Sequence, residues 1–179
     1  MPDSFLIRPA VPSDSEGIAK VHTGSWQSAY RGILPDDWLD ALKWQDRKER
    51  WDIGLRVGSP ATIYVATNSE KEIVGFASMA HTRDEDLDSD ISFELYAIYL
   101  SPKVWRKGVG SRLLSEILQQ IPHHAKQITL WVLTKNLQGR AFYERHGFKA
   151  DGARKMAEIG TNELEEIRYR LELGQDRHR

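Results

Sequence analysis

A turn rich in glycine and basic residues lies between two apolar segments. It spans residues 105–111, Trp-Arg-Lys-Gly-Val-Gly-Ser. Gly108 and Gly110 allow backbone N–H groups to approach a ligand closely, and the start of the following helix favours an anion by about 0.3–1 kcal/mol. Because Arg106 and Lys107 add positive charge, the spacing predicts a phosphate-binding turn. Taken by itself, the same turn is also consistent with a tight helix entry that needs only small residues.

The turn differs from two common phosphate loops. It has no GxxxxGK[ST] pattern, and the pattern G-x-G-x-x-G fails because Leu113 occupies the third glycine position. The sequence therefore predicts neither a P-loop nor a dinucleotide-binding fingerprint.

A second segment, residues 136–148, reads as a helix over residues 136–146 with marked ends. Asn136 is a favourable N-cap residue and Gly147 a favourable stop. Tyr143 lies inside this helix, and taken by itself it reads as a core aromatic residue whose hydroxyl is satisfied within the protein.

The elements that must position these segments alternate in type. Residues 91–100 and 128–133 are apolar on both faces, which is typical of central strands. Residues 108–121 carry an apolar stripe at helical spacing. The remaining expected strands are 5–8, 61–67, 72–81, 154–159 and 163–173, and the remaining expected helices begin near residues 13, 35 and 46. This order predicts an α/β or α+β protein with a single sheet.

Composition sets further limits. The chain has 179 residues and a formal net charge of −1, so we expect one domain over residues 1–173 with a frayed tail over 174–179. The absence of cysteine excludes a Cys nucleophile and a thiolate metal site, and His123-His124 has no partner at metal-ligand spacing. We expect no metal, nucleic-acid partner or membrane association. No secretory signal or long apolar run is present, so a cytoplasmic location is the expectation.

Together the two segments resemble the GNAT superfamily of acyl-CoA-dependent N-acetyltransferases. The family motif R/Q-x-x-G-x-G/A aligns on residues 105–110, with Trp105 in the Arg/Gln position. The motif N-x-x-A-x-x-x-Y-E-x-x-G-F aligns on residues 136–148, with Gly139 in the Ala position. The resemblance covers nearly the whole chain and implies a GNAT-type fold. In that fold a single mixed sheet of six to seven strands is flanked by helices, and two central parallel strands splay apart. Residues 25–35 also look like a branch that includes polyamine acetyltransferases.

The resemblance implies acetyl-CoA as co-substrate. Its pyrophosphate would lie on the turn and its pantetheine arm along residues 98–100, with Asn136 bonding the arm and Arg140 reaching the phosphates. Trp105 raises the question whether pyrophosphate binding is weakened, and Arg106 or Lys107 would supply the missing charge. The implied cofactor-binding residues are Ile98, Tyr99, Leu100, Arg106, Lys107, Gly108, Val109, Gly110, Ser111, Asn136, Arg140 and Tyr143.

The implied reaction transfers acetyl directly to an amine. An alkylamine of pKa about 10.4 must lose a proton first, which costs roughly 4.6 kcal/mol at pH 7, so a general base helps. Glu94 is the candidate base by position in the family, and an ordinary polar strand residue is its alternative. His81 is a second candidate base. Tyr143 is the family's candidate acid for the departing thiolate.

The sequence does not identify the acceptor. Trp26, Tyr30 and His81 are the candidate acceptor-binding residues, and five carboxylates within residues 84–90 form a loop that would attract a cationic acceptor. The leading hypothesis is a small primary amine, polyamine-like or otherwise. A protein N-terminus or lysine, and a catalytically silent acyl-CoA-binding domain, are the alternatives. An acidic rim and a closed aromatic pocket favour the small amine, whereas an open groove favours a peptide. Family relatives are often dimers, so a homodimer is also an expectation.

Overall fold

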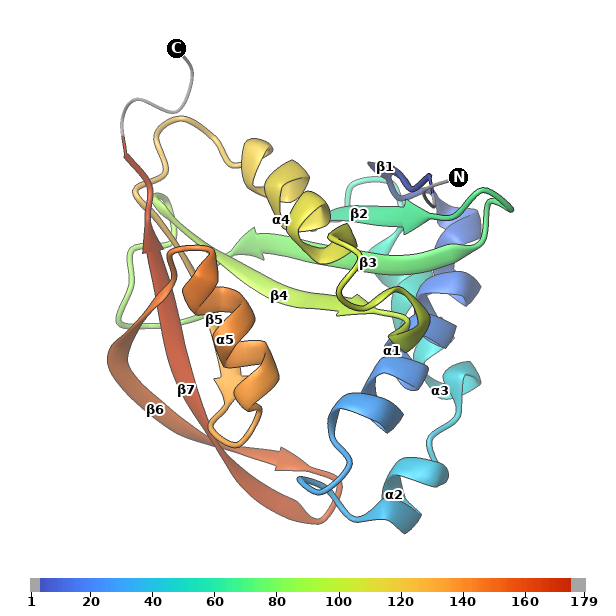
Figure 1. The fold of residues 1–179 in the computed structure, drawn as a ribbon. Helices are drawn as coiled ribbons and strands as arrows, with labels where there is room; N and C mark the ends of the chain where they lie inside the picture. Colours follow the sequence, from blue (N-terminus) through green and yellow to red (C-terminus); the bar gives the residue numbers. More distant parts are fainter. Residues whose placement is uncertain (1–3, 175–179) are drawn as a thin grey trace.

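Seven strands form one mixed sheet in a computed structural model that describes residues 4–174 (Figure 1). The strand order is β1-β2-β3-β4-β5-β7-β6, and only β4 and β5 are parallel neighbours. The strands are β1 (Leu6–Pro9), β2 (Thr62–Thr67), β3 (Ile73–His81), β4 (Ser92–Leu100), β5 (Gln127–Leu133), β6 (Lys149–Ile159) and β7 (Asn162–Glu172). The helices are α1 (Ser15–Ala29), α2 (Asp36–Asp40), α3 (Trp44–Gly54), α4 (Val109–Gln119) and α5 (Leu137–Arg145). The expected GNAT-type sheet is confirmed. Apart from residue 174, the tail expected to fray lies outside the described residues.

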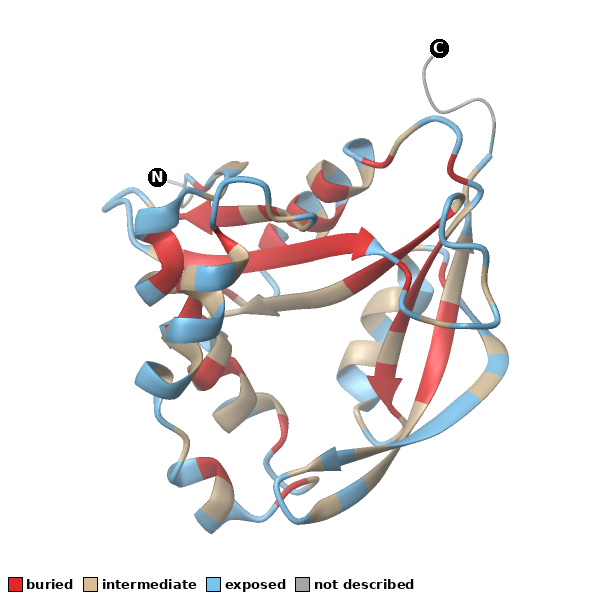
Figure 2. Ribbon diagram, turned by 180° about the vertical axis from the view of Figure 1, so that it is seen from behind, coloured by how far each residue is buried: buried red, intermediate tan, exposed pale blue. Residues whose placement is uncertain are grey.

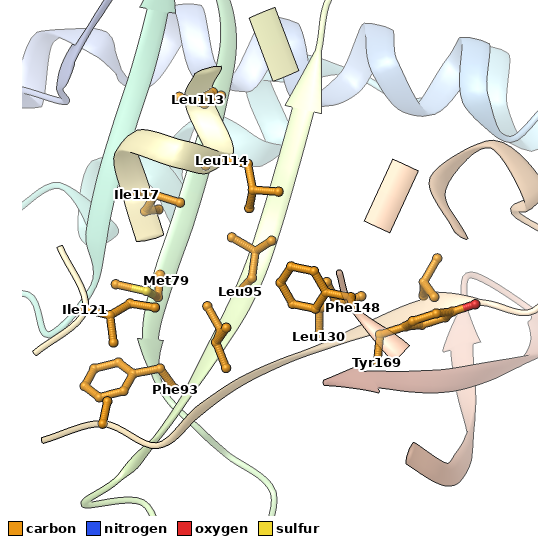
Figure 3. Packing of buried hydrophobic residues seen from close by; sticks show 14 of the residues in the cluster. Met79, Phe93, Leu95, Leu113, Leu114, Ile117, Ile121, Leu130, Phe148 and Tyr169 are labelled. Atoms are coloured by element: carbon orange, nitrogen blue, oxygen red, sulfur yellow. The ribbon is translucent and has the colours of Figure 1, made fainter. Parts of the chain in front are cut away.

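Helices cover both faces of the sheet. On one face the apolar stripe of α4, including Leu113 and Ile117, packs against Met79 of β3 and Leu95 of β4 (Figure 3). On the other face α1 packs Ile18 and other apolar residues against β2 and β3. Central strand β3 is therefore buried along most of its length, whereas edge strand β6 is largely exposed (Figure 2). No helix in the described part of the chain has the length and hydropathy to cross a bilayer.

The central parallel strands separate early. Pairing between β4 and β5 is confined to residues 92–94 and 127–129, although both strands continue beyond these pairs. A β-bulge on the β3 side, where Ser78 pairs with Ala97 and Met79 with Leu95, leaves Tyr96 as an extra residue. Such a bulge bends and twists its strand. Beyond Glu94, the edge of β4 that faces β5 has no strand partner, which confirms the expected splay.

Strand β6 begins earlier than the sequence predicts. It starts at Lys149 rather than near residue 154, because Gly152 adopts a φ of 95° and lets the strand pass through an irregularity between Ala150 and Arg154. A left-handed conformation of this kind favours glycine. The expected hairpin across Gly160 is present.

The acidic loop has a structural role. Asp84 and Asp86 accept hydrogen bonds from Arg168 of β7 at 3.2 and 2.7 Å, and Asp151 of β6 accepts a third at 2.7 Å. Trp131 of β5 also donates to Asp84 at 3.0 Å. The side chain of Arg168 is only 4% exposed, and its bonds to these aspartates raise its pKa further. The loop therefore ties β5, β6 and β7 together, and two of the carboxylates expected to attract a cationic acceptor are already neutralised.

We expect Arg168→Leu to lower the free energy of unfolding by about 1–3 kcal/mol, because the half-buried Asp84 loses its cation, whereas Asp151 keeps its ion pair with Arg170. Urea unfolding followed by circular dichroism measures the change. Arg154→Leu is the matched control, since Arg154 pairs with Glu165 on the exposed surface of the same hairpin and should cost less than about 1 kcal/mol. Equal small losses in the two variants would contradict the structural role of the loop.

Candidate active site

The glycine-rich turn presents unused backbone donors. Helix α4 begins at Val109 and has Gly108 as a left-handed N-cap with φ 79° and no side-chain cap. Arg106 also has a positive φ, 61°. The first N–H groups of a helix have no partner within it, and a Cβ built on Gly108 would meet nothing within 4 Å. This geometry fits an anionic group at the start of α4.

Trp105 closes this turn. Its indole Nε1 donates to the carbonyl oxygen of Leu100 at 3.1 Å, which ties the turn to the last residue of β4. Gly110 lies where a Cβ would come within 3.1 Å of Leu100 and 3.3 Å of Phe142, so helices α4 and α5 approach closely here. A second link joins Ser111 Oγ to His146 Nε2 at 3.0 Å. The turn is therefore held in place by contacts with β4 and with the C-terminal end of α5. Trp105 positions the turn and contributes no charge to it.

Side chains in the unpaired part of β4 point alternately to the two faces of the sheet. Ile98 and Leu100 contact the core on the α4 side, and Tyr99 contacts the α1 side. The backbone groups of this segment are left for a ligand on the β5 side, which suits an extended chain carrying amides. The expected cofactor-binding strand and turn thus lie next to each other.

Asn136 and Arg140 are both engaged within the protein. Asn136 Oδ1 accepts a hydrogen bond from the N–H of Gly139 at 3.0 Å, and a Cβ on Gly139 would come within 2.6 Å of the Asn136 amide. Arg140 donates to the Tyr169 hydroxyl and the Thr134 carbonyl oxygen, both at 3.1 Å.

The expectation that Arg140 reaches the phosphates needs correction. On α5 it shares a face with Glu144, which accepts a hydrogen bond from Tyr169 at 2.6 Å. Phe142 and His146, which contact α4, lie on the opposite face. Arg140 therefore points toward β7 and away from the glycine-rich turn.

Tyr143 lies at the splay. Its ring packs edge-on against Phe142 and Phe148 with centroids 5.4 and 5.9 Å away. Within the described residues its hydroxyl makes no hydrogen bond. Burial raises its pKa above the ordinary tyrosine value, and the neighbouring Tyr99 adds to this effect. The hydroxyl is therefore held protonated and can donate to a group entering between β4 and β5.

Glu94 is buried and paired. It is 2% exposed and accepts hydrogen bonds from Arg83 Nη2 at 2.6 Å, Nε at 3.1 Å and the backbone N–H at 3.2 Å. Both carboxylate oxygens of Glu94 are therefore engaged by Arg83, which leaves neither of them free for an incoming amine. This placement disfavours the expected role of Glu94 as general base.

His81 faces the wrong side of the sheet for an acceptor-binding residue. It shares the α4 side with Met79, its ring lies 4.5 Å from that of Phe93, and its Nδ1 bonds the carbonyl oxygen of Ser89 at 2.6 Å. Trp26 and Tyr30 lie on the other face. The expectation that His81 faces the acceptor is therefore wrong, because strand parity directs it away.

An aromatic cluster covers the α1 side of β4. It consists of His22, Trp26, Tyr30, Trp51, Phe76 and Tyr99. The Tyr30 and Tyr99 hydroxyls are 3.3 Å apart, and the His22 ring stacks on Tyr99 at 5.1 Å. The candidate residues Trp26 and Tyr30 thus meet the expected cofactor-binding strand, because positions 22, 26 and 30 share one face of α1.

Two charged residues beside this cluster were missed in the sequence. Glu166 of β7 pairs in register with Leu133 of β5, which packs against Tyr30. Burial raises the pKa of Glu166, and Lys155, whose Nζ is 3.7 Å away, partly opposes the shift. Arg47 of α3 lies over the Trp26 ring at 4.5 Å. The alternation of side chains along β7 is consistent with an inward-facing Glu166. No local sequence pattern, however, distinguished Glu166 from the neighbouring glutamates of the same strand.

Burial within the aromatic cluster keeps His22 neutral. Burial, with a smaller contribution from Arg47 and Arg50, lowers the pKa of His22 to about 3. Its Nδ1 accepts a hydrogen bond from the Trp51 indole at 3.3 Å, so Nε2 carries the proton.

We expect His22 to make the protein less stable at acid pH. The unfolded chain protonates His22 near pH 6.5, whereas the native state does so near pH 3, so stability falls as the pH drops from 6.5 toward 3. The loss should be about 2 kcal/mol at pH 5. Urea unfolding at pH 7 and pH 5 should show this loss in the wild type and not in His22→Phe. The same pH dependence in both proteins would contradict a neutral, buried His22.

Known proteins match both the sequence and the fold. The sequence model of the Acetyltransferase (GNAT) family matches residues 23–148. The uncharacterized N-acetyltransferase YuaI of Bacillus subtilis is 33% identical over 131 residues, which cover 73% of this chain and 72% of YuaI. A spermidine N(1)-acetyltransferase of Thermoplasma acidophilum is 23% identical over 152 residues, 83% of this chain and 90% of that protein. The crystal structure of PaiA N-acetyltransferase from Thermoplasma acidophilum, in complex with coenzyme A, has a TM-score of 0.67 at 20% identity, covering 91% of this chain and 98% of that chain. The chain belongs to the Acetyltransferase (GNAT) family, and the protein is an N-acetyltransferase.

Proposed function

We propose that the protein transfers acetyl from acetyl-CoA to the primary amine of a small molecule. The observation that carries this proposal is the separation of β4 from β5 after Glu94, beside the uncapped N-terminus of α4. The turn would hold the pyrophosphate and the β4 edge the pantetheine arm, with the reactive end near Tyr143. The coenzyme A bound to the structural relative of 20% identity supports the same donor.

Contacts between α2 and the β6–β7 hairpin close the α1 side of the sheet, and this closure supports a small acceptor. Helix α2 touches the β6–β7 turn, where a Cβ on Gly160 would collide with the Trp38 indole. Ile159 and Leu164 join Trp38 and Tyr30 in one apolar cluster. A cavity of about 140 Å³ lies at this junction, lined by Ile33, Leu133, Thr134, Lys135, Leu164 and Glu165. A protein chain passing between α2 and the hairpin would have to break these contacts, so the arrangement favours a compact acceptor over a peptide.

The amine must lose a proton before it attacks. Glu166 is better placed to take it than Glu94, because Glu94 is bonded to Arg83 on both oxygens, whereas burial raises the pKa of Glu166. The lone pair of the neutral amine then forms the C–N bond at the thioester carbonyl, either directly beside Glu166 or through a water. The proton removed from nitrogen resides on Glu166 and later passes to solvent.

Tyr143 completes the transfer. As the C–S bond breaks, its electron pair moves to sulfur, and the hydroxyl proton of Tyr143 stabilises the charge that develops there. Burial, which raises the pKa of Tyr143, keeps that proton in place until the thiolate forms. The nitrogen loses its second proton as the intermediate collapses, and this proton balances the one that Tyr143 gives to sulfur. The products are an N-acetylated amine, the free thiol of CoA and Tyr143 in its protonated form.

We expect Tyr143→Phe and Glu166→Gln each to lower kcat/KM for an amine by about 10²–10⁴-fold, the usual contribution of a positioned acid or base. The assay follows CoA release with a thiol reagent, which the cysteine-free chain does not consume. Calorimetry with acetyl-CoA should show unchanged affinity in Glu166→Gln. Glu166→Gln should also remove the limb of the pH–rate profile that reports the base.

Failure of the wild type to bind acetyl-CoA at millimolar concentration would contradict the proposed donor. A profile and rate that are unchanged in Glu166→Gln, together with a large loss in Glu94→Gln, would return the role of base to Glu94.

A further inference from the structure

Arg47 differs from the other sheltered arginines. Among the arginines of residues 4–174 that are not exposed, Arg8, Arg168 and Arg170 pair with aspartates, and Arg140 bonds a hydroxyl and a carbonyl oxygen. Arg47 makes neither an ion pair nor a hydrogen bond in this part of the chain. Its guanidinium lies on the face of Trp26, 4.5 Å from the ring centroid. Burial lowers its pKa, and the neighbouring Arg50 adds to this effect.

A half-buried cation without an anion is costly. Stacking on an aromatic ring contributes about 0.5–2 kcal/mol at most in such sites and leaves the N–H donors of the guanidinium unsatisfied. A planar guanidinium with free donors is the preferred protein partner of a carboxylate, which it binds through two parallel hydrogen bonds.

The surroundings of Arg47 add further donors and an opposite charge. Trp26 contacts Tyr30 at 4.9 Å between ring centroids, and the Tyr30 hydroxyl is 3.3 Å from that of Tyr99. Arg47 on α3 and Glu166 on β7 both interact electrostatically with Tyr30 and Tyr99. A cationic and an anionic side chain therefore act on the same two hydroxyls.

We propose that Arg47 binds the carboxylate of the acceptor, so that the substrate is an amino acid whose amino group is directed toward Glu166. This inference rests on the proposed function, because it names the acceptor class of the same site. A polyamine fits less well: Arg47 would repel it, and Asp84 and Asp86 are already bound to Arg168.

The test uses matched acceptors that differ only in the carboxylate. The common amino acids, the corresponding amino acid amides and spermidine are offered to the wild type with acetyl-CoA, and CoA release is followed. We expect at least one amino acid to be acetylated with a kcat/KM about 10²-fold above that of its amide. Arg47→Gln should reduce that ratio to near one, mainly by raising KM for the acid and leaving KM for the amide unchanged.

Arg50→Gln is the matched control, because Arg50 is an exposed arginine on the same helix. It should keep the preference for the carboxylate. Thermal melting and acetyl-CoA titration of Arg47→Gln establish that the variant folds and binds the donor.

Other outcomes separate this inference from the proposed function. Efficient acetylation of spermidine with no preference for acids, or equal effects of Arg47→Gln on acid and amide, would overturn the role of Arg47 while the acetyltransferase reaction stands. If no amine is acetylated, the proposed function fails. Calorimetric titration of the amino acids then decides the inference: binding that Arg47→Gln abolishes supports it, and absence of binding overturns it.

Discussion

The early end of pairing between β4 and β5 is the constraint on which the site depends. A parallel pair normally continues its hydrogen bonds as far as both strands extend, but here pairing ends at Glu94 and Thr129. The bulge at Tyr96 turns β4 away, and the Tyr96 hydroxyl holds this bend by donating to the His81 carbonyl oxygen at 2.7 Å. The unpaired backbone then needs a partner, since buried peptide groups without hydrogen bonds are costly. We propose that the amide-bearing pantetheine arm of the donor supplies that partner.

The rest of the molecule keeps this opening in shape. Helices α4 and α5 meet at Gly110 and Phe142 and set the position of the uncapped turn beside the end of β4. On the other side of the strands, Arg168 fastens the loop that precedes β4 to β6 and β7. The open edge is therefore bordered by two rigid structures. One presents N–H groups for an anion, and the other presents the inner face of β7 with Glu166.

Much of the cofactor side could be predicted because its signals are local. The glycine spacing at 108 and 110, the N-cap at Asn136 and the apolar run of β5 each describe a few consecutive residues, and all three were confirmed as a turn, a capped helix and a central strand. The roles of these residues toward acetyl-CoA follow from the family resemblance and stay predictions.

The acceptor side could not be predicted in the same way, because it depends on facing and on distant pairs. His81 was assigned to the acceptor side, but strand parity directs it to the opposite face. The guanidinium that occupies Glu94 comes from Arg83, eleven positions earlier. Arg47 and Glu166 are separated by more than a hundred residues, and only the packing of α3 on α1 and of β7 on β5 brings them to the same aromatic cluster.

The most direct test of the account is amide hydrogen exchange with and without acetyl-CoA. The donor is expected to slow exchange along the β4 edge, residues 95–100, and at the start of α4, residues 108–111, with little change in β6. Binding that leaves both segments unchanged and protects another part of the chain would contradict the central claim that the splayed strands hold the donor.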